Sequence, residues 1–153
     1  MNFPLFLVPI LVGLTAQGLK PILNRGWYTK MEEKGKVMPR YGGMPSAHTA
    51  FAFSIATMVV VVEGADSLLF AVVAAIAVFV IDDALRMRVF LGGHGRALHQ
   101  LVNRLPATER RGFPYLETHL GHRPFEVAVG AVLGVLLTWL IMWLVPICCG
   151  FVI

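Results

Sequence analysis

The sequence predicts an all-α fold, a membrane bundle of about four transmembrane helices. Of the 153 residues, 57% are hydrophobic and only 14% are charged, and the mean hydropathy is +0.72, which is too apolar for an ordinary soluble domain. The apolar residues form long runs, and a hydrocarbon core about 30 Å thick needs roughly 20 such residues per helix. Runs such as "FAVVAAIAVFVI" are continuously apolar, whereas a strand of a membrane barrel alternates, so helices are favoured.

Four segments are long and apolar enough to be predicted as spans: 3–23, 45–62, 67–81 with a polar extension to Arg88, and 124–147. The first lacks a basic leader and a cleavage site, so we expect it to remain as a helix. In the loop 89–123, Leu98, Leu101 and Leu105 follow helical spacing, which indicates either an amphipathic interfacial helix or a plain connector. Because the spans fill most of the chain, residues 1–153 are expected to form one membrane-embedded domain.

The basic residues lie on one face of the predicted membrane topology. With four spans, the loops 24–44 and 89–123 share a face, and all 13 Lys and Arg residues lie in or beside it. The positive-inside rule therefore places these loops in the cytoplasm. The net charge of +4 comes from residues that flank hydrophobic spans and alternate with acids, which favours anionic lipid over nucleic acid as a partner. The adjacent Cys148 and Cys149 are read as helix-end residues, with lipidation as the alternative.

Two polar motifs, "GGMPSAHTA" from Gly42 and "GHRPFEV" from Gly121, stand at the starts of the second and fourth spans. Each contains a proline, Pro45 or Pro124, where a first-turn proline is tolerated because its missing N–H would have had no partner. Both helix N-termini therefore point into the same loop layer. Such ends present unpaired N–H groups and a partial positive charge, and they attract phosphate.

The residue types in these motifs suit phosphoryl transfer. His122 and Glu126 are four apart, so if the fourth helix extends back to His122 they share a face, and the carboxylate can accept a hydrogen bond from Nδ1–H and leave Nε2 as a nucleophile. His48 is placed to donate a proton to a leaving oxygen, and Ser46 with the amides after Gly43 to hold phosphate oxygens. The alternatives are ordinary ones: a polar anchor at the membrane interface for a histidine, and a partner for the helix dipole for Glu126.

These motifs resemble those of the type 2 phosphatidic acid phosphatase and vanadium haloperoxidase superfamily. The order "GGMPSAHTA", "IDDALRMRVFLGGHGRALHQL", "LGHRPFEVAVGAVLG" is similar to its divergent, short bacterial and plastid branch, over about residues 17–134. The resemblance implies a metal-free helical phosphatase with no cofactor, with His122 as nucleophile, Glu126 as its orienting carboxylate and His48 as general acid.

The resemblance also suggests the substrate-binding cations. Leu116 stands where the main family has an arginine before the nucleophilic histidine, and the main family's Lys-x6-Arg-Pro motif is missing. In the divergent branch the phosphate clamp is implied to come from Lys20, Arg40 and Arg88, with Asp83 beside the last of these.

Other polar residues have simpler readings. Asp82 and Asp83 end an apolar run and are either functional or paired with Arg86 at a helix end. His94, His99 and His119 do not fall at positions that the resembled family marks and are taken as surface residues. With His122 they could instead be zinc ligands, but their spacing does not match a common zinc motif and the resemblance implies no metal.

The sequence therefore predicts an integral membrane lipid-phosphate phosphatase of the bacterial inner membrane, with its active-site loops facing the cytoplasm. A homo-oligomer is one option that the sequence leaves open. A phosphomonoester or diphosphate lipid would be the substrate. The rival hypotheses are a binding or transport protein for anionic lipid that keeps the phosphate site without cleaving, and a purely structural membrane subunit.

Overall fold

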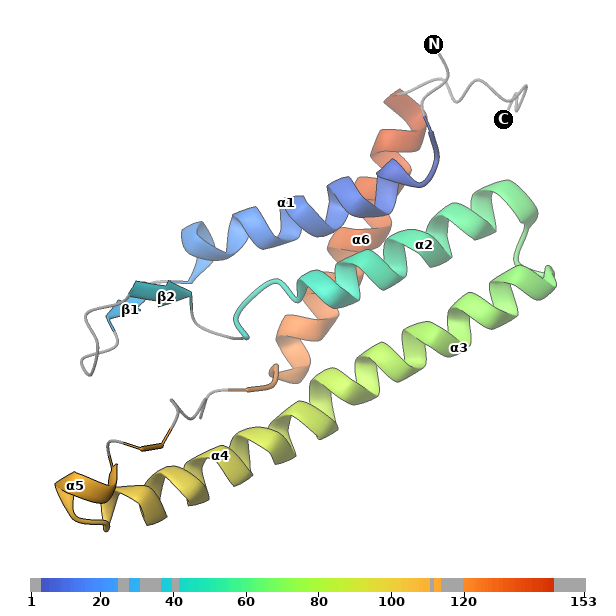
Figure 1. Cartoon of the computed structure of the whole chain (residues 1–153). Helices are drawn as coiled ribbons and strands as arrows, with labels where there is room; N and C mark the ends of the chain where they lie inside the picture. The colour runs from blue at the N-terminus through green and yellow to red at the C-terminus, as the bar shows by residue number, and fades with distance from the viewer. Residues whose placement is uncertain are drawn as a thin grey trace.

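Four apolar helices form a bundle in the computed structural model, with three of them packed against the fourth (Figure 1). Their bounds are Leu7–Leu23 (α1), Ala47–Glu63 (α2), Leu68–Asp82 (α3) and Pro124–Leu144 (α6). Helix α2 contacts the other three. The structure describes residues 4–24, 28–30, 37–39, 42–110, 112–113 and 120–144. The prediction of an all-α bundle is confirmed, and each expected span corresponds to one helix.

Helices α2 and α6 approach closely because small residues lie between them. A Cβ at Gly130 would lie 2.5 Å from the carbonyl oxygen of Ser46, and a Cβ at Gly134 would collide with the carbonyl oxygen of Ala50. One turn farther on, the hydroxyl of Thr138 donates to Ser54 Oγ across the interface at 2.5 Å. Close backbone approach with a buried hydroxyl pair is typical of helix packing in membranes.

Helix α1 packs on α2 through a row of residues four apart. Val8, Val12 and Ala16 are buried, and Val12 and Ala16 form a core cluster with Ala50 of α2. The next position in the row is Lys20, which is only 5% exposed. The face that buries the apolar residues of α1 therefore ends in a buried cation.

The third span is longer than predicted. Helix α3 continues without a break into a π-helical turn, Asp83–Met87 (η1), and then into α4, Arg88–Asn103. Together they make a rod of 36 residues, about 54 Å long at 1.5 Å per residue. The prediction that the span ends at Arg88 and gives way to a loop is wrong, because residues 88–103 contain no proline and continue the helix. The helix expected around Leu98 and Leu101 is present, but as the end of this rod (Figure 1).

Three short elements lie outside the four apolar helices. Strands Tyr28–Lys30 (β1) and Val37–Pro39 (β2) pair antiparallel, with Thr29 opposite Met38. A single turn, Ala107–Arg110 (α5), follows α4. The hairpin was not predicted.

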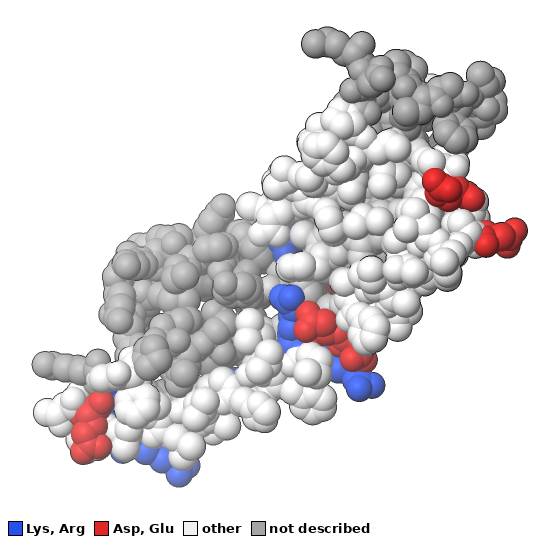
Figure 2. Space-filling model, turned by 45° about the vertical axis from the view of Figure 1, so that its right-hand side comes forward, with Lys and Arg blue, Asp and Glu red and all other residues white. Residues whose placement is uncertain are grey.

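By length and composition, two helical segments of the described chain can cross a membrane, Leu68–Asn103 and Pro124–Leu144, whereas α1 and α2 are shorter apolar helices of 17 residues. Large apolar side chains are exposed along α3 and α6, including Phe79, Trp139 and Trp143. Figure 2 shows a broad uncharged surface over the upper half of the molecule, interrupted by acidic side chains at its right-hand edge, with basic and acidic side chains gathered at mid-height and toward the lower end. An apolar surface of this kind suits lipid rather than water.

Candidate active site

The end of α1 and the starts of α2 and α6 lie at one end of the bundle, beside the middle of the α3–α4 rod (Figure 1). The two sequence motifs meet there. Helix α6 begins at Pro124, as predicted. Helix α2 begins at Ala47 with Ser46 as its N-cap, so Pro45 lies one residue before the cap and not in the first turn as expected.

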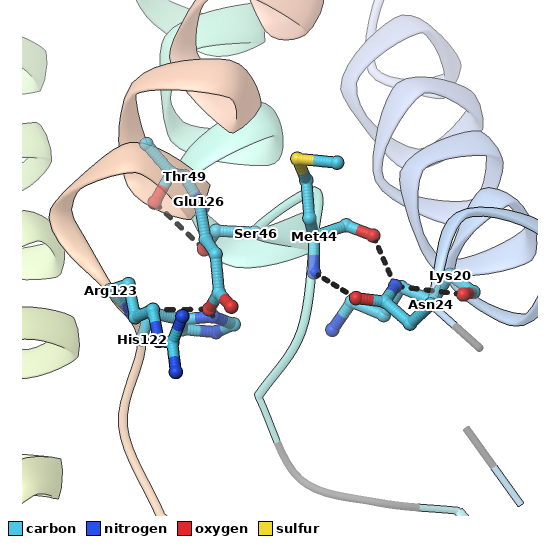
Figure 3. Close-up of polar contacts among 8 residues, drawn as sticks. All are labelled: Lys20, Asn24, Met44, Ser46, Thr49, His122, Arg123 and Glu126. Carbon is cyan, nitrogen blue, oxygen red and sulfur yellow. Dashed lines mark hydrogen bonds and ion pairs between the residues drawn. The ribbon is translucent and has the colours of Figure 1, made fainter. Parts of the chain in front are cut away.

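His122 and Glu126 form the centre of the site (Figure 3). The Nδ1–H of His122 donates to Glu126 Oε2 at 3.0 Å, and the same oxygen accepts the backbone N–H of Arg123 at 3.2 Å. His122 is buried, with 8% of its surface exposed. The carboxylate therefore caps the first turn of α6 and fixes the imidazole so that Nε2 carries the free lone pair.

Ser46 joins the two helix starts but is not open to a ligand. Its backbone N–H donates to the carbonyl of Glu126 at 3.1 Å, and its Oγ accepts the hydroxyl of Thr49 at 2.9 Å and the N–H of Thr49 at 3.4 Å. The residue is 0% exposed. A direct phosphate contact was expected for Ser46, and the structure instead gives it an N-cap role that holds α2 against α6.

The loop before α2 reaches the segment before α6 through glycines. Gly42, Gly43 and Gly121 have φ of 92°, 79° and 105°, a region that favours glycine. A Cβ at Gly42 would lie 2.7 Å from the carbonyl oxygen of Gly121. The loop before α2 therefore packs against the chain segment that leads to His122.

Asn24, at the C-cap of α1, clamps the same loop (Figure 3). Its Nδ2 donates to the carbonyls of Met44 at 2.6 Å and Lys20 at 2.8 Å, while its Oδ1 accepts the N–H of Met44 at 2.9 Å. The N–H of Met44 is thus used within the protein, and it is one of the amides that was expected to bind phosphate.

Two of the three predicted cations are brought to the site. Lys20 interacts electrostatically with Glu126 and His122, and Arg88 with His122. Arg88 Nε also donates to Asp83 Oδ2 at 2.6 Å, so the pairing expected from the sequence between these two residues is present. Arg40 lies outside the described residues, as do Leu116 and His119.

His48 occupies the first turn of α2, as predicted, and is exposed. It lies close enough to His122, Arg88 and Lys20 for their charges to act on it. The two histidines of the two motifs therefore lie within electrostatic range of each other, His122 buried and hydrogen-bonded to Glu126, His48 exposed. This arrangement suits a fixed nucleophile and a mobile proton donor.

Burial lowers the pKa of His122, the hydrogen bond to Glu126 opposes this shift, and the positive charges of Lys20 and Arg88 add to it. The net lowering favours the neutral imidazole at neutral pH. A neutral ring is the form in which Nε2 can attack an electrophile.

The other polar residues lie away from this cluster. Asp82 pairs with Arg86 at 3.0 Å on the exposed side of the rod, which confirms the simpler of its two readings. His94 and His99 are exposed on α4. Within the ranges that the structure describes, no three His, Cys, Asp or Glu side chains are grouped closely enough to hold a metal ion.

Two features of the site were missed by sequence reasoning. One is the Asn24 clamp, for which the only signal is an asparagine after the last turn of a helix, a common cap. The other is the π turn η1, where the N–H of Arg88 bonds to the carbonyl of Asp83 and the carbonyl of Ala84 accepts the N–H of His122 at 3.1 Å. Neither contact has a periodicity that a sequence pattern can reveal.

Comparison with known proteins agrees with these motifs. The family model described as "Divergent PAP2 family" matches residues 1–137. The chain is 38% identical over 109 residues to the "Uncharacterized membrane protein YuiD" of Bacillus subtilis (strain 168). The aligned region covers 63% of this chain and 68% of the Bacillus protein. No solved structure matches the chain. The match of the family model over nearly the whole described bundle, including both histidine motifs, establishes that the chain belongs to the Divergent PAP2 family.

Proposed function

We propose that this protein is a metal-independent lipid-phosphate phosphatase that works through a phosphohistidine on His122. The observation that carries the proposal is the hydrogen bond between His122 Nδ1 and Glu126 Oε2, at 3.0 Å in a buried setting. It leaves Nε2 as the reactive nitrogen of a ring that lies within electrostatic range of His48, Lys20 and Arg88. A nucleophile oriented by a carboxylate, with a proton donor and cations nearby, is the set of groups that phosphoryl transfer needs.

In the first step Nε2 of His122 attacks phosphorus, a P–N bond forms, and the P–O bond to the lipid alcohol breaks. The imidazole becomes positively charged, and Glu126 stabilises that charge. His48 in its protonated form gives its proton to the leaving alkoxide. Lys20 and Arg88 offset the negative charge on the non-reacting phosphate oxygens.

In the second step a water molecule attacks phosphorus, His48 accepts its proton, and the P–N bond breaks. Inorganic phosphate leaves and His122 returns to the neutral form. Ser46, Gly43 and Asn24 hold the loop and the helix start in place and take no part in the bond changes.

The apolar surface around the helices suits a substrate whose tail lies in the membrane. The candidates are phosphatidic acid, phosphatidylglycerol phosphate, and polyprenyl phosphate or diphosphate. We further propose that the site faces the cytoplasm of a bacterial inner membrane, since the Lys and Arg residues gather on the side of the site.

The test is phosphate release by the purified protein in detergent from a panel of these lipids, with His122→Ala as the inactive control. Rapid quenching with a ³²P-labelled substrate should trap protein-bound phosphate that is stable to alkali and labile to acid. Orthovanadate should inhibit as a five-coordinate mimic of the transition state, and EDTA should not. A wild-type protein that binds one lipid and cleaves none would replace this proposal with the lipid-binding or transport function.

A further inference from the structure

We propose that the π turn η1 (Asp83–Met87) is the device that positions the nucleophile, by giving up a helix carbonyl to the backbone of His122. This inference rests on the proposed function, since it assigns a purpose to a distortion of the rod beside the proposed active site.

The hydrogen bonds of η1 show how the carbonyl is released. In an α-helix the N–H of Arg88 would bond to the carbonyl of Ala84, four residues back. In η1 it bonds to the carbonyl of Asp83, five residues back. The carbonyl of Ala84, which is buried, accepts the N–H of His122 at 3.1 Å. A residue 38 positions away in sequence thus takes the place of a helix donor.

The segment 120–122 follows the same face of the rod farther along. A Cβ at Gly121 would lie 2.7 Å from Val89 Cγ2, and a Cβ at Gly92 would lie 3.0 Å from the carbonyl oxygen of Leu120. Ala84, Val89 and Gly92 therefore contact one extended strip of chain. Val89 stands five positions after Ala84, so the extra residue of the π turn is what brings Ala84 onto the face that Val89 and Gly92 present.

The same spacing pairs Asp83 with Arg88. These residues are also five apart, and Asp83 Oδ2 lies 2.6 Å from Arg88 Nε. The π turn therefore contributes to the site in two ways. Its Ala84 carbonyl anchors the backbone of His122, and its Asp83 carboxylate pairs with Arg88, whose positive charge acts on His122. Within the part of the rod that the structure describes, Asp82 and Arg86 form a separate exposed pair at the ordinary spacing of four.

Deletion of Leu85 tests this assignment, with Leu85→Ala as the matched control. The deletion removes the extra residue, so the turn can close as an α-helix, and both ion pairs keep helical spacings of three and four residues. Leu85→Ala removes almost the same side-chain atoms, from a partly buried position, and keeps the extra residue. The deletion should lower kcat on the lipid phosphate by about 100-fold, since displacement of a reacting group by about 1 Å can cost that much. Leu85→Ala should stay within about threefold of wild type.

Hydrogen–deuterium exchange gives a readout that does not depend on activity. The amide of His122 should lose protection in the deletion variant and keep it in Leu85→Ala. Unchanged protection or unchanged kcat in a folded deletion variant would overturn the proposal. If the deletion variant does not fold, the test compares Asp83→Asn with Asp82→Asn. Asp83→Asn should weaken vanadate binding and lower kcat, whereas Asp82→Asn should change neither. A wild type without phosphatase activity that still shows the exchange difference would refute the proposed function and support the anchoring role of η1.

Discussion

His122 and Glu126 are joined by a 3.0 Å hydrogen bond between Nδ1 and Oε2, four residues apart at the start of α6. The bond fixes which ring nitrogen can react and places a negative charge beside the ring. Glu126→Gln keeps a hydrogen-bond acceptor but removes the charge that stabilises the imidazolium of the phosphohistidine. We expect kcat to fall by at least about 100-fold, with KM changed little. The measurement is steady-state release of phosphate from the best lipid, and a fall of less than threefold would contradict the role given to the carboxylate.

His48 should be separable from His122 by the leaving group. His48→Ala should slow phosphorylation of His122 by roughly 10²–10⁴-fold with an alkyl phosphate lipid, whose alkoxide needs a proton, and far less with p-nitrophenyl phosphate. His122→Ala should abolish turnover of both substrates. The comparison is made by rapid mixing on the first step, because His48 also serves as base in the second. An equal loss of phosphorylation rate in His48→Ala on the two substrates would contradict the general-acid role of His48.

The pH profile should reflect the lowered pKa of His122. Burial and the nearby cations make protonation harder and lower the pKa of His122, so less than half of the ring is protonated at a pH where an ordinary histidine, with a pKa of about 6.5, is half protonated. The rising limb that His122 gives to kcat/KM should therefore lie below pH 6.5. Lys20→Met removes a repelling charge and should raise the pKa of His122, as measured by NMR titration of its imidazole carbon signals. Arg86→Gln, on the exposed side of the rod, should leave this pKa unchanged.

Gly134 should tolerate no side chain. A Cβ there collides with the carbonyl of Ala50, so Gly134→Ala should destabilise the α2–α6 interface by about 1–3 kcal/mol. The control is Gly18→Ala in α1, where no atom lies within 4 Å of the new Cβ and helix propensity favours alanine. Thermal unfolding in one detergent compares the two variants. Equal midpoints would show that α2 and α6 are not in the close contact described.

The proposed orientation can be tested with single cysteines after Cys148 and Cys149 are replaced by serine. A cysteine at Ala65, in the turn between α2 and α3, should react with a membrane-impermeant maleimide in intact cells. A cysteine at Gly112, beyond α5, should react only after the membrane is opened. The reverse pattern would place the site on the outer face.

The sequence by itself determined the helices and the local chemistry of the site. Long apolar runs predict helices without reference to the rest of the chain, and the short spacing of His122 and Glu126 predicts their hydrogen bond. The bond forms although α6 begins only at Pro124, two residues after His122. The first-turn position of His48 follows in the same way. These features depend only on residues within a turn or two of each other.

Only the tertiary structure decided which of the remaining polar residues serve the site and how. Ser46 caps α2 and packs against Gly130 of α6, and Asn24 holds the loop at Met44. The π turn leaves the carbonyl of Ala84 available to the N–H of His122. The contacts of Ser46 with Gly130, of Asn24 with Met44 and of Ala84 with His122 each join segments far apart in the sequence. The first and the last also depend on a close approach of backbones that a glycine or an extra helical residue allows. Such contacts have no local period, so their physical cause, the satisfaction of buried backbone groups, becomes visible only once the helices are packed.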